Sequence, residues 1–192
     1  SIKDINFDFN ALKLIKNFAL DSKGDDKLLS AISIFFENNG FPILDWKDQC
    51  KDLFINKKCL TLKKPSKESI SNRDKGLDIF KLIGKTDIAQ SLIIQNNIVL
   101  GIEAAEGTDE LIKRCFEYKN LGDKGILIKL SKYNQHSNLD IPVIGIETVK
   151  KLKAYDYEGV FLEKNKCMII DKDEVIKFSN ANDIFIASVD KN

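Results

Sequence analysis

The sequence has few of the residues that several common functional sites require. Arg73 and Arg114 are the only arginines, so bidentate recognition of phosphates or bases by arginine is scarce. His136 is the only histidine, which excludes a metal site built from several histidines. The 4 cysteines show no C-x-x-C spacing. This argues against a zinc ribbon and a dense disulfide framework, and it fits a reducing cytosol.

Long apolar runs and a charge excess are missing as well. No apolar run approaches the roughly 20 residues that a membrane-spanning helix needs, and the first residues do not resemble a signal peptide. The net charge is +1, and lysine pairs such as Lys57-Lys58 have no interleaved aromatic residues, so we expect no nucleic-acid partner. A P-loop, a dinucleotide-binding glycine motif and a Ser-His-Asp triad are not found either.

The residues that are present predict an ordinary folded protein. The chain has 192 residues, of which 43% are hydrophobic and 31% charged, a mixture that can bury a core. Its length suits one domain, or one domain with a helical annex.

Hydrophobic periodicity predicts an α/β fold with a mixed, mostly parallel sheet covered by helices and an N-terminal helical linker segment. Residues 1–55 are expected to form this segment, with helices over about 11–19 and 28–36, a left-handed cap at Gly40 and a short strand at about 41–44. Residues 56–72 are predicted as a polar linker with one short strand at about 59–62, at the start of an α/β domain that spans 56–192. In that domain we expect helices at about 73–83, 109–119, 147–154 and 172–181, and strands at about 92–95, 98–103, 126–130, 142–145, 160–163, 168–170 and 184–189.

The most informative segment is the acidic turn Glu103-Ala104-Ala105-Glu106-Gly107-Thr108-Asp109, where a strand ends and a helix begins. Backbone amides at a helix start favour a phosphate, but each of the three carboxylates would repel one by roughly 4 kcal/mol at short range. An anionic ligand would therefore need a divalent cation, which indicates Mg²⁺ coordination by oxygen ligands. The alternative is that Thr108 caps the helix while Asp109 and Glu110 interact with its dipole.

Two further segments carry candidate residues, and each has a structural alternative. Gly24-Asp25-Asp26 lies before a predicted helix, where it is equally consistent with a helix cap. Asp140 stands at the end of a polar loop, just before a strand that Pro142 restricts to an edge or to a first position. A carboxylate there could hold a metal or orient water, or it could form a turn.

The order of these segments resembles the LpxI family of UDP-2,3-diacylglucosamine pyrophosphatases. The resemblance runs from about Gly24 to the C-terminus and includes the acidic turn and Asp140. The matching blocks are Gly24-Asp25-Asp26-x-Leu28-Leu29-Ser30, Asp87-Ile88-x-Gln90-Ser91, Glu103-Ala104-x-Glu106-Gly107-Thr108-Asp109 followed by Gly125-Ile126-Leu127-Ile128-Lys129, Asp140-Ile141-Pro142-x-Ile144-Gly145, and Ile170-Asp171-Lys172-Asp173-Glu174-Val175-Ile176.

The resemblance implies an enzyme of lipid A biosynthesis that is cytoplasmic and peripheral to the inner membrane. Such an enzyme uses Mg²⁺ to hydrolyse UDP-2,3-diacylglucosamine to UMP and 2,3-diacylglucosamine 1-phosphate. The family also carries an N-terminal α/β domain, which the chain is expected to lack, with the ligand between the two domains. A homodimer is left open.

The resemblance also implies roles for individual residues. Asp140, Glu106 and Asp109 are the catalytic candidates, and the first two are also the metal-ligand candidates. The substrate-binding candidates are Gly24, Asp25, Asp26, Gln90, Gly107, Thr108, Lys132 and Gln135.

Around Asp140 the chain departs from the family pattern. Tyr133 replaces a proline, His136 an aspartate and Asn138 an arginine, which removes one phosphate-binding group and one candidate metal ligand. One alternative is therefore a non-catalytic nucleotide- or lipid-binding fragment that retains the fold. Another is a nucleotide-binding protein unrelated to lipid.

Overall fold

The computed structural model describes residues 25–44, 49–83, 89–131 and 141–191. The chain divides into two compact units, of which the smaller includes helix α2 (Asp25–Asn38). Gly40 follows α2 with a φ of 82°, the left-handed conformation predicted for it. The strand predicted at 41–44 is not formed, because these residues find no pairing partner in the described part of the chain. The helix predicted at 11–19 lies outside the described residues.

The larger unit is built on a five-stranded mixed sheet with the strand order β2-β1-β3-β5-β7. β1 runs antiparallel to both of its neighbours, whereas β3, β5 and β7 are mutually parallel. The α/β class with a mixed sheet is thus confirmed. The strands are β1 (Ser91–Gln95), β2 (Ile98–Ile102), β3 (Ile126–Lys129), β5 (Gly159–Glu163) and β7 (Phe185–Val189), and a separate parallel pair joins β4 (Val143–Ile144) to β6 (Met168–Ile169).

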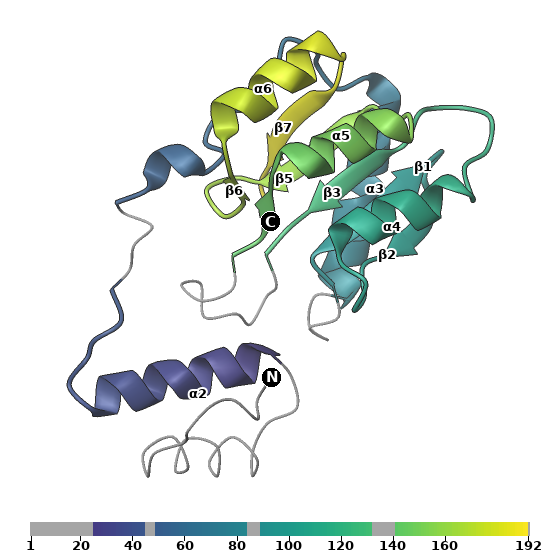
Figure 1. Cartoon of the computed structure of the whole chain (residues 1–192). Coiled ribbons are helices and arrows are strands. Elements are labelled where there is room, and N and C mark those ends of the chain that lie inside the picture. Colours follow the sequence, from purple (N-terminus) through teal and green to yellow (C-terminus); the bar gives the residue numbers. More distant parts are fainter. Residues whose placement is uncertain (1–24, 45–48, 84–88, 132–140, 192) are drawn as a thin grey trace, which may run out of the picture. The chain divides into compact units, whose positions relative to one another are not determined.

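Helices cover both faces of this sheet (Figure 1). Successive side chains of a strand point to opposite faces, so the buried residues form two cores. One core contains Leu127 and Val160, and it also includes buried residues of the helices α4 (Thr108–Phe116), α5 (Ile146–Ala154) and α6 (Lys172–Ala181). We call this side the α4 face. The other core contains Ile128 and Phe161 together with residues of α3 (Lys67–Ile83), and we call this side the α3 face.

The predicted linker over 56–72 is wrong in its last third, because α3 already begins at Lys67. The Ser66 hydroxyl accepts a hydrogen bond from the Ser69 amide (3.1 Å), as an N-cap does. Buried Glu158 accepts bonds from the Ser66 amide (3.2 Å) and hydroxyl (2.6 Å) and from the Ser69 hydroxyl. Polar contacts rather than an apolar stripe therefore hold the first turn of α3, and hydrophobic periodicity could not reveal them.

The strand predicted at 59–62 reduces to a single bridge. Cys59 pairs with Ala187 of β7, and the Leu60 amide donates to the Ile186 carbonyl (2.9 Å). A short 3₁₀ helix, η3 (Lys51–Leu53), was not predicted. The segment that includes Cys59 thus follows the outer edge of β7 without extending the sheet by a full strand.

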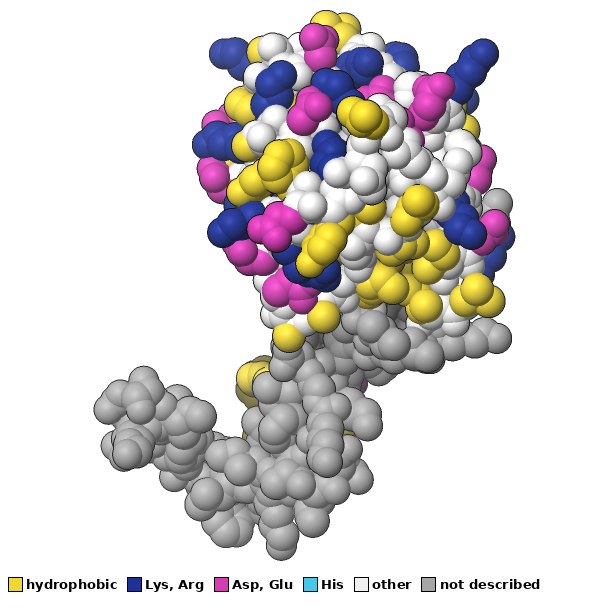
Figure 2. All heavy atoms as spheres, turned by 90° about the vertical axis from the view of Figure 1, so that its right-hand side faces the viewer, with side chains coloured by type: hydrophobic (Ala, Val, Ile, Leu, Met, Phe, Trp, Pro, Cys, Tyr) yellow, Lys and Arg dark blue, Asp and Glu magenta, His cyan; other side chains and the backbone are white. Residues whose placement is uncertain are grey.

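The surface agrees with the near-zero net charge. On the side shown in Figure 2, basic and acidic side chains are interspersed, and several hydrophobic side chains lie together at the lower right of the coloured surface. No helix within the described ranges is long and apolar enough to cross a membrane.

Candidate functional site

The acidic turn leads into α4 at the point where β1 and β3 meet. Ser91 of β1 lies opposite Lys129 of β3, and Thr108 is the first residue of α4. The hydroxyls of Ser91 and Thr108 are 3.3 Å apart, and the Lys129 ammonium donates to the Thr108 hydroxyl. Thr108 in turn donates to Oε1 of Glu103 (2.7 Å). We call Ser91, Glu103, Thr108 and Lys129 the Thr108 cluster.

Two members of the Thr108 cluster carry charge in places that solvent hardly reaches. Lys129 is only 6% exposed, and Oε2 of Glu103 is buried without a hydrogen-bond partner in the described part of the chain. Burying a carboxylate oxygen without a partner costs free energy. A cation or a hydrogen-bond donor that bound to this oxygen would remove that cost.

Gly107 is the N-cap residue of α4, with a φ of 81°. Among the residues that the structure describes, no side chain makes a capping hydrogen bond there. Thr108 therefore does not cap the helix, which corrects the structural alternative considered for it. Its hydroxyl belongs instead to the Thr108 cluster, next to the positive end of the helix dipole. That Gly107 and Thr108 bind a phosphate remains a prediction.

Glu106 pairs with Arg114 of α4. Nε and Nη2 of Arg114 lie 3.0 and 2.7 Å from Oε1 of Glu106, while Oε2 accepts from the Ala104 amide at 3.1 Å. These hydrogen bonds, that to Arg114 first, hold the pKa of Glu106 below its ordinary value of 4.5. Arg114 also donates to the Ile102 carbonyl (2.8 Å), so the pair fixes the turn between β2 and α4.

Asp109 is engaged by α5. It accepts a hydrogen bond from the Thr148 hydroxyl (3.0 Å) and lies 3.5 Å from the Lys151 ammonium. Asp109 thus links the first turn of α4 to α5.

The described residues contain no group of three or more His, Cys, Asp or Glu side chains placed to hold a metal ion. Glu106 and Asp109 are bound to Arg114 and to Thr148 and Lys151, respectively, so the structure does not bring them together. The metal role predicted for Glu106 and the catalytic roles predicted for Glu106 and Asp109 stay predictions.

The remaining candidates lie in several places. Gln90 immediately precedes β1, and its carbonyl accepts from the Leu130 amide (2.8 Å), so it lies beside the Thr108 cluster. Asp25 and Asp26 begin α2, which belongs to the smaller unit. Four predicted site residues fall outside the described residues: Gly24, Lys132, Gln135 and Asp140.

Sequence reasoning missed Lys129 and Ser91 as members of the site. The available signal was one lysine inside the apolar run Ile126-Leu127-Ile128-Lys129-Leu130, where a fully buried strand would have no charge. Arg114 was missed as well, and its only signal was that it stands eight residues after Glu106 on the following helix.

The comparisons with known proteins agree in pointing to one family. Residues 56–187 match the family model of the LpxI C-terminal domain, and residues 1–53 match that of the LpxI N-terminal domain. The chain is 28% identical to the UDP-2,3-diacylglucosamine pyrophosphatase LpxI of Caulobacter vibrioides over 190 residues, which cover 95% of the chain and 68% of that protein. The expectation that the family's N-terminal domain is missing is thus wrong, because the region interpreted as a linker matches the model of that domain.

Proposed function

Because the chain belongs to the LpxI family, we propose that it hydrolyses the diphosphate of UDP-2,3-diacylglucosamine in lipid A biosynthesis, with Mg²⁺, giving UMP and 2,3-diacylglucosamine 1-phosphate. The observation that carries the proposal is the Thr108 cluster, which places a buried ammonium beside an uncapped helix start inside the matched domain. Both features favour a phosphate group.

In this proposal Lys129 and the start of α4 bind the diphosphate. The Lys129 ammonium has three donors, and one of them is used on the Thr108 hydroxyl. Because Lys129 is buried, its attraction for a phosphate oxygen is screened less than that of a surface lysine. The Thr108 hydroxyl accepts a hydrogen bond from Lys129 and donates one to Glu103. These two bonds fix the hydroxyl, and it in turn positions the ammonium.

The donor set of the Thr108 cluster is consistent with Mg²⁺, which prefers carboxylate oxygens and substrate phosphates. Oε2 of Glu103 has no hydrogen-bond partner in the described part of the chain and could serve as a ligand. We propose that Glu103 is a ligand of the ion and that Glu106 fixes the turn through Arg114. A metal role for Asp140 is what the family resemblance implies. When bound, Mg²⁺ would neutralise phosphate charge and polarise the diphosphate.

The residue proposed to act on water is Asp140, in line with the family resemblance. A carboxylate near the diphosphate would orient the attacking water and take up its proton. Lys132 and Gln135 would contact polar groups of the substrate, as would Gly24, Asp25 and Asp26. We further propose a cytoplasmic location peripheral to the inner membrane, where a diacylated substrate would be found.

The test is release of UMP from UDP-2,3-diacylglucosamine. We expect turnover in the presence of Mg²⁺, loss of turnover when EDTA removes the ion, and loss in Asp140→Ala. Substrate binding by each variant, measured calorimetrically, separates failed chemistry from failed binding. Binding of the substrate without any UMP release by the unmodified protein would contradict the proposal and favour the non-catalytic alternative.

A further inference from the structure

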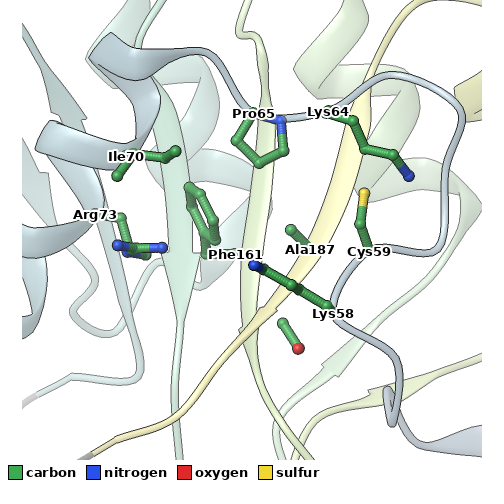
Figure 3. A pocket seen from close by; sticks show the side chains of 9 residues that line it. Lys58, Cys59, Lys64, Pro65, Ile70, Arg73, Phe161 and Ala187 are labelled. Carbon is green, nitrogen blue, oxygen red and sulfur yellow. The ribbon is translucent and has the colours of Figure 1, made fainter.

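A pocket of about 510 Å³ opens on the α3 face of the sheet. Its volume falls in the range typical of small-molecule sites. Three of its lining residues are cationic (Lys58, Lys64 and Arg73), and three others form apolar walls (Pro65, Ile70 and Phe161). Figure 3 shows Arg73 beside the Phe161 ring and Lys58 extending toward the middle of the pocket.

The pocket lies between two covers of the α3 face: the helix α3 and the segment of chain that leads into it. α3 packs over β1 and β3, toward one edge of the sheet. At the other edge, the segment that contains Lys58 follows β7, with the Ser188 amide donating to the Lys58 carbonyl (3.0 Å). Phe161 of β5 lies between these two covers and lines the pocket.

The charge in the pocket has one sign. No carboxylate lines it, and Lys58 makes no ion pair within the described ranges of the chain. Lys64 uses one donor on the Thr61 carbonyl (2.8 Å). Arg73 lies over the Phe161 ring, with its guanidinium carbon 5.5 Å from the centroid, and uses Nε and Nη2 on Asp74. Each of these cations keeps donors for a further anion.

We propose that this pocket binds an anionic amphiphile: a single alkyl chain that ends in a phosphate or carboxylate. The apolar walls would cover the chain, and Lys58 and Lys64 would bind the head group. A nucleotide fits less well, because the lining side chains other than the cations offer only the Ser188 hydroxyl and the Cys59 thiol to recognise the edge of a base.

This site is separate from the proposed diphosphate site. Phe161 belongs to the core of the α3 face, whereas the Thr108 cluster adjoins α4 on the opposite face. The proposed ligand site is therefore distinct from the site proposed for the diphosphate, and its test does not depend on that reaction.

The direct experiment is a calorimetric titration of the full chain with decyl phosphate below its micelle-forming concentration. Decanol and inorganic phosphate serve as the uncharged and the chain-free probes. We expect decyl phosphate to bind at least about tenfold more tightly than either, since the pocket supplies both a charged hydrogen bond and apolar contact. Equal affinity for decanol or for inorganic phosphate would overturn the proposal.

Two variants locate the binding. The first is the double variant Lys58→Gln, Lys64→Gln, which removes both proposed head-group contacts. The matched control is the double variant Lys57→Gln, Lys67→Gln, which removes two exposed lysines that do not line the pocket. We expect the first pair to weaken decyl phosphate binding about tenfold and the control to leave it within twofold. Similar losses in both pairs would show non-specific attraction and would overturn the assignment.

Ile70→Asp tests the apolar wall, at a position that is 39% exposed in the N-terminal half of α3 and therefore tolerant of a charge. It should weaken decyl phosphate binding about tenfold, and unchanged affinity would contradict the proposed location. The KM for UDP-2,3-diacylglucosamine should stay within twofold in the Lys58→Gln, Lys64→Gln variant. A larger rise would show that the substrate itself occupies the pocket, and it would overturn the claim of a separate ligand.

Discussion

The two faces of the central sheet differ in how completely helices cover them. On the α4 face, which three helices cover, Lys129 is only 6% exposed and lies beside the Thr108 hydroxyl. On the α3 face, one helix leaves a pocket at whose walls Lys58 and Lys64 keep contact with solvent. A charge shielded from water interacts more strongly than a hydrated one. Loss of the buried ammonium should therefore cost far more function than loss of the pocket lysines.

The largest effect is expected from Lys129→Met, which keeps the apolar stem and removes the charge. We expect kcat/KM for UMP release to fall about 100-fold or more, as when a buried donor to developing charge is removed. The melting temperature should change little, because the cost of burying the Lys129 charge is removed while Glu103, which Thr108 links to Lys129, loses a nearby cation.

The matched control for this prediction is Lys113→Met, which alters an exposed lysine of α4. The kcat/KM of this variant for UMP release should stay within about twofold of that of the unmodified protein, as expected for a surface charge. Equal activities of the two variants would contradict the claim that the buried lysine contributes more to the reaction than an exposed one.

A second prediction perturbs the α3 face through the backbone. A Cβ added at Gly159 would lie 2.3 Å from the Phe185 carbonyl oxygen, whereas one added at Gly145 meets nothing within 4 Å. Gly159→Ala should therefore lower the free energy of unfolding by about 1–3 kcal/mol or more, and Gly145→Ala by less than about 1 kcal/mol. Urea unfolding of both variants measures the difference, and equal midpoints would contradict the close approach of β5 and β7.

A third prediction sharpens the role of Thr108. Thr108→Val removes the hydroxyl that links Lys129 to Glu103, so we expect kcat/KM for UMP release to fall about tenfold. Thr108→Ser restores the hydroxyl and should recover most of the activity. Failure of the serine variant to recover activity would show that the methyl group, rather than the hydrogen bonds, is what matters.

The smallest effect is a pH dependence on the α4 face. The hydrogen bond to Arg114 lowers the pKa of Glu106 below 4.5 in the folded protein. The pair therefore stabilises the fold fully above about pH 4.5, and this stabilisation is lost as the pH falls through the lowered pKa. Glu106→Gln should therefore lower the melting temperature at pH 7, and the difference should shrink as the pH falls below about 4.5. Glu110→Gln on the same helix is the control, and an equal pH dependence in both variants would contradict this role of the pair.

Most elements could be predicted because hydrophobic periodicity reports burial directly. The predicted strands at 92–95 and 160–163 and the predicted helix at 172–181 agree with β1, β5 and α6 to within one residue at each end. The errors fall where polar contacts set the structure. The start of α3 depends on Ser66 and on Glu158, which is 92 residues away from Ser66 in the chain, and no local pattern carries that information.

The candidate site was predicted in part for the same reason. The acidic turn was recognisable because its residues are contiguous, and so was the helix that begins at Thr108. Lys129 is 21 residues beyond Thr108, and the meeting of the two depends on the pairing of β1 with β3. The pairing of Glu106 with Arg114 could not be predicted from the sequence either. The fold of the turn decides which carboxylate Arg114 reaches.

The central claim is that the buried Lys129 ammonium binds the diphosphate, and titration of the chain with UDP tests it without requiring turnover. We expect UDP to bind the unmodified protein and Lys113→Met with similar affinity, and to bind Lys129→Met at least about tenfold more weakly. Equal affinity of UDP for all three proteins would contradict the account, because the diphosphate would then bind without the Thr108 cluster.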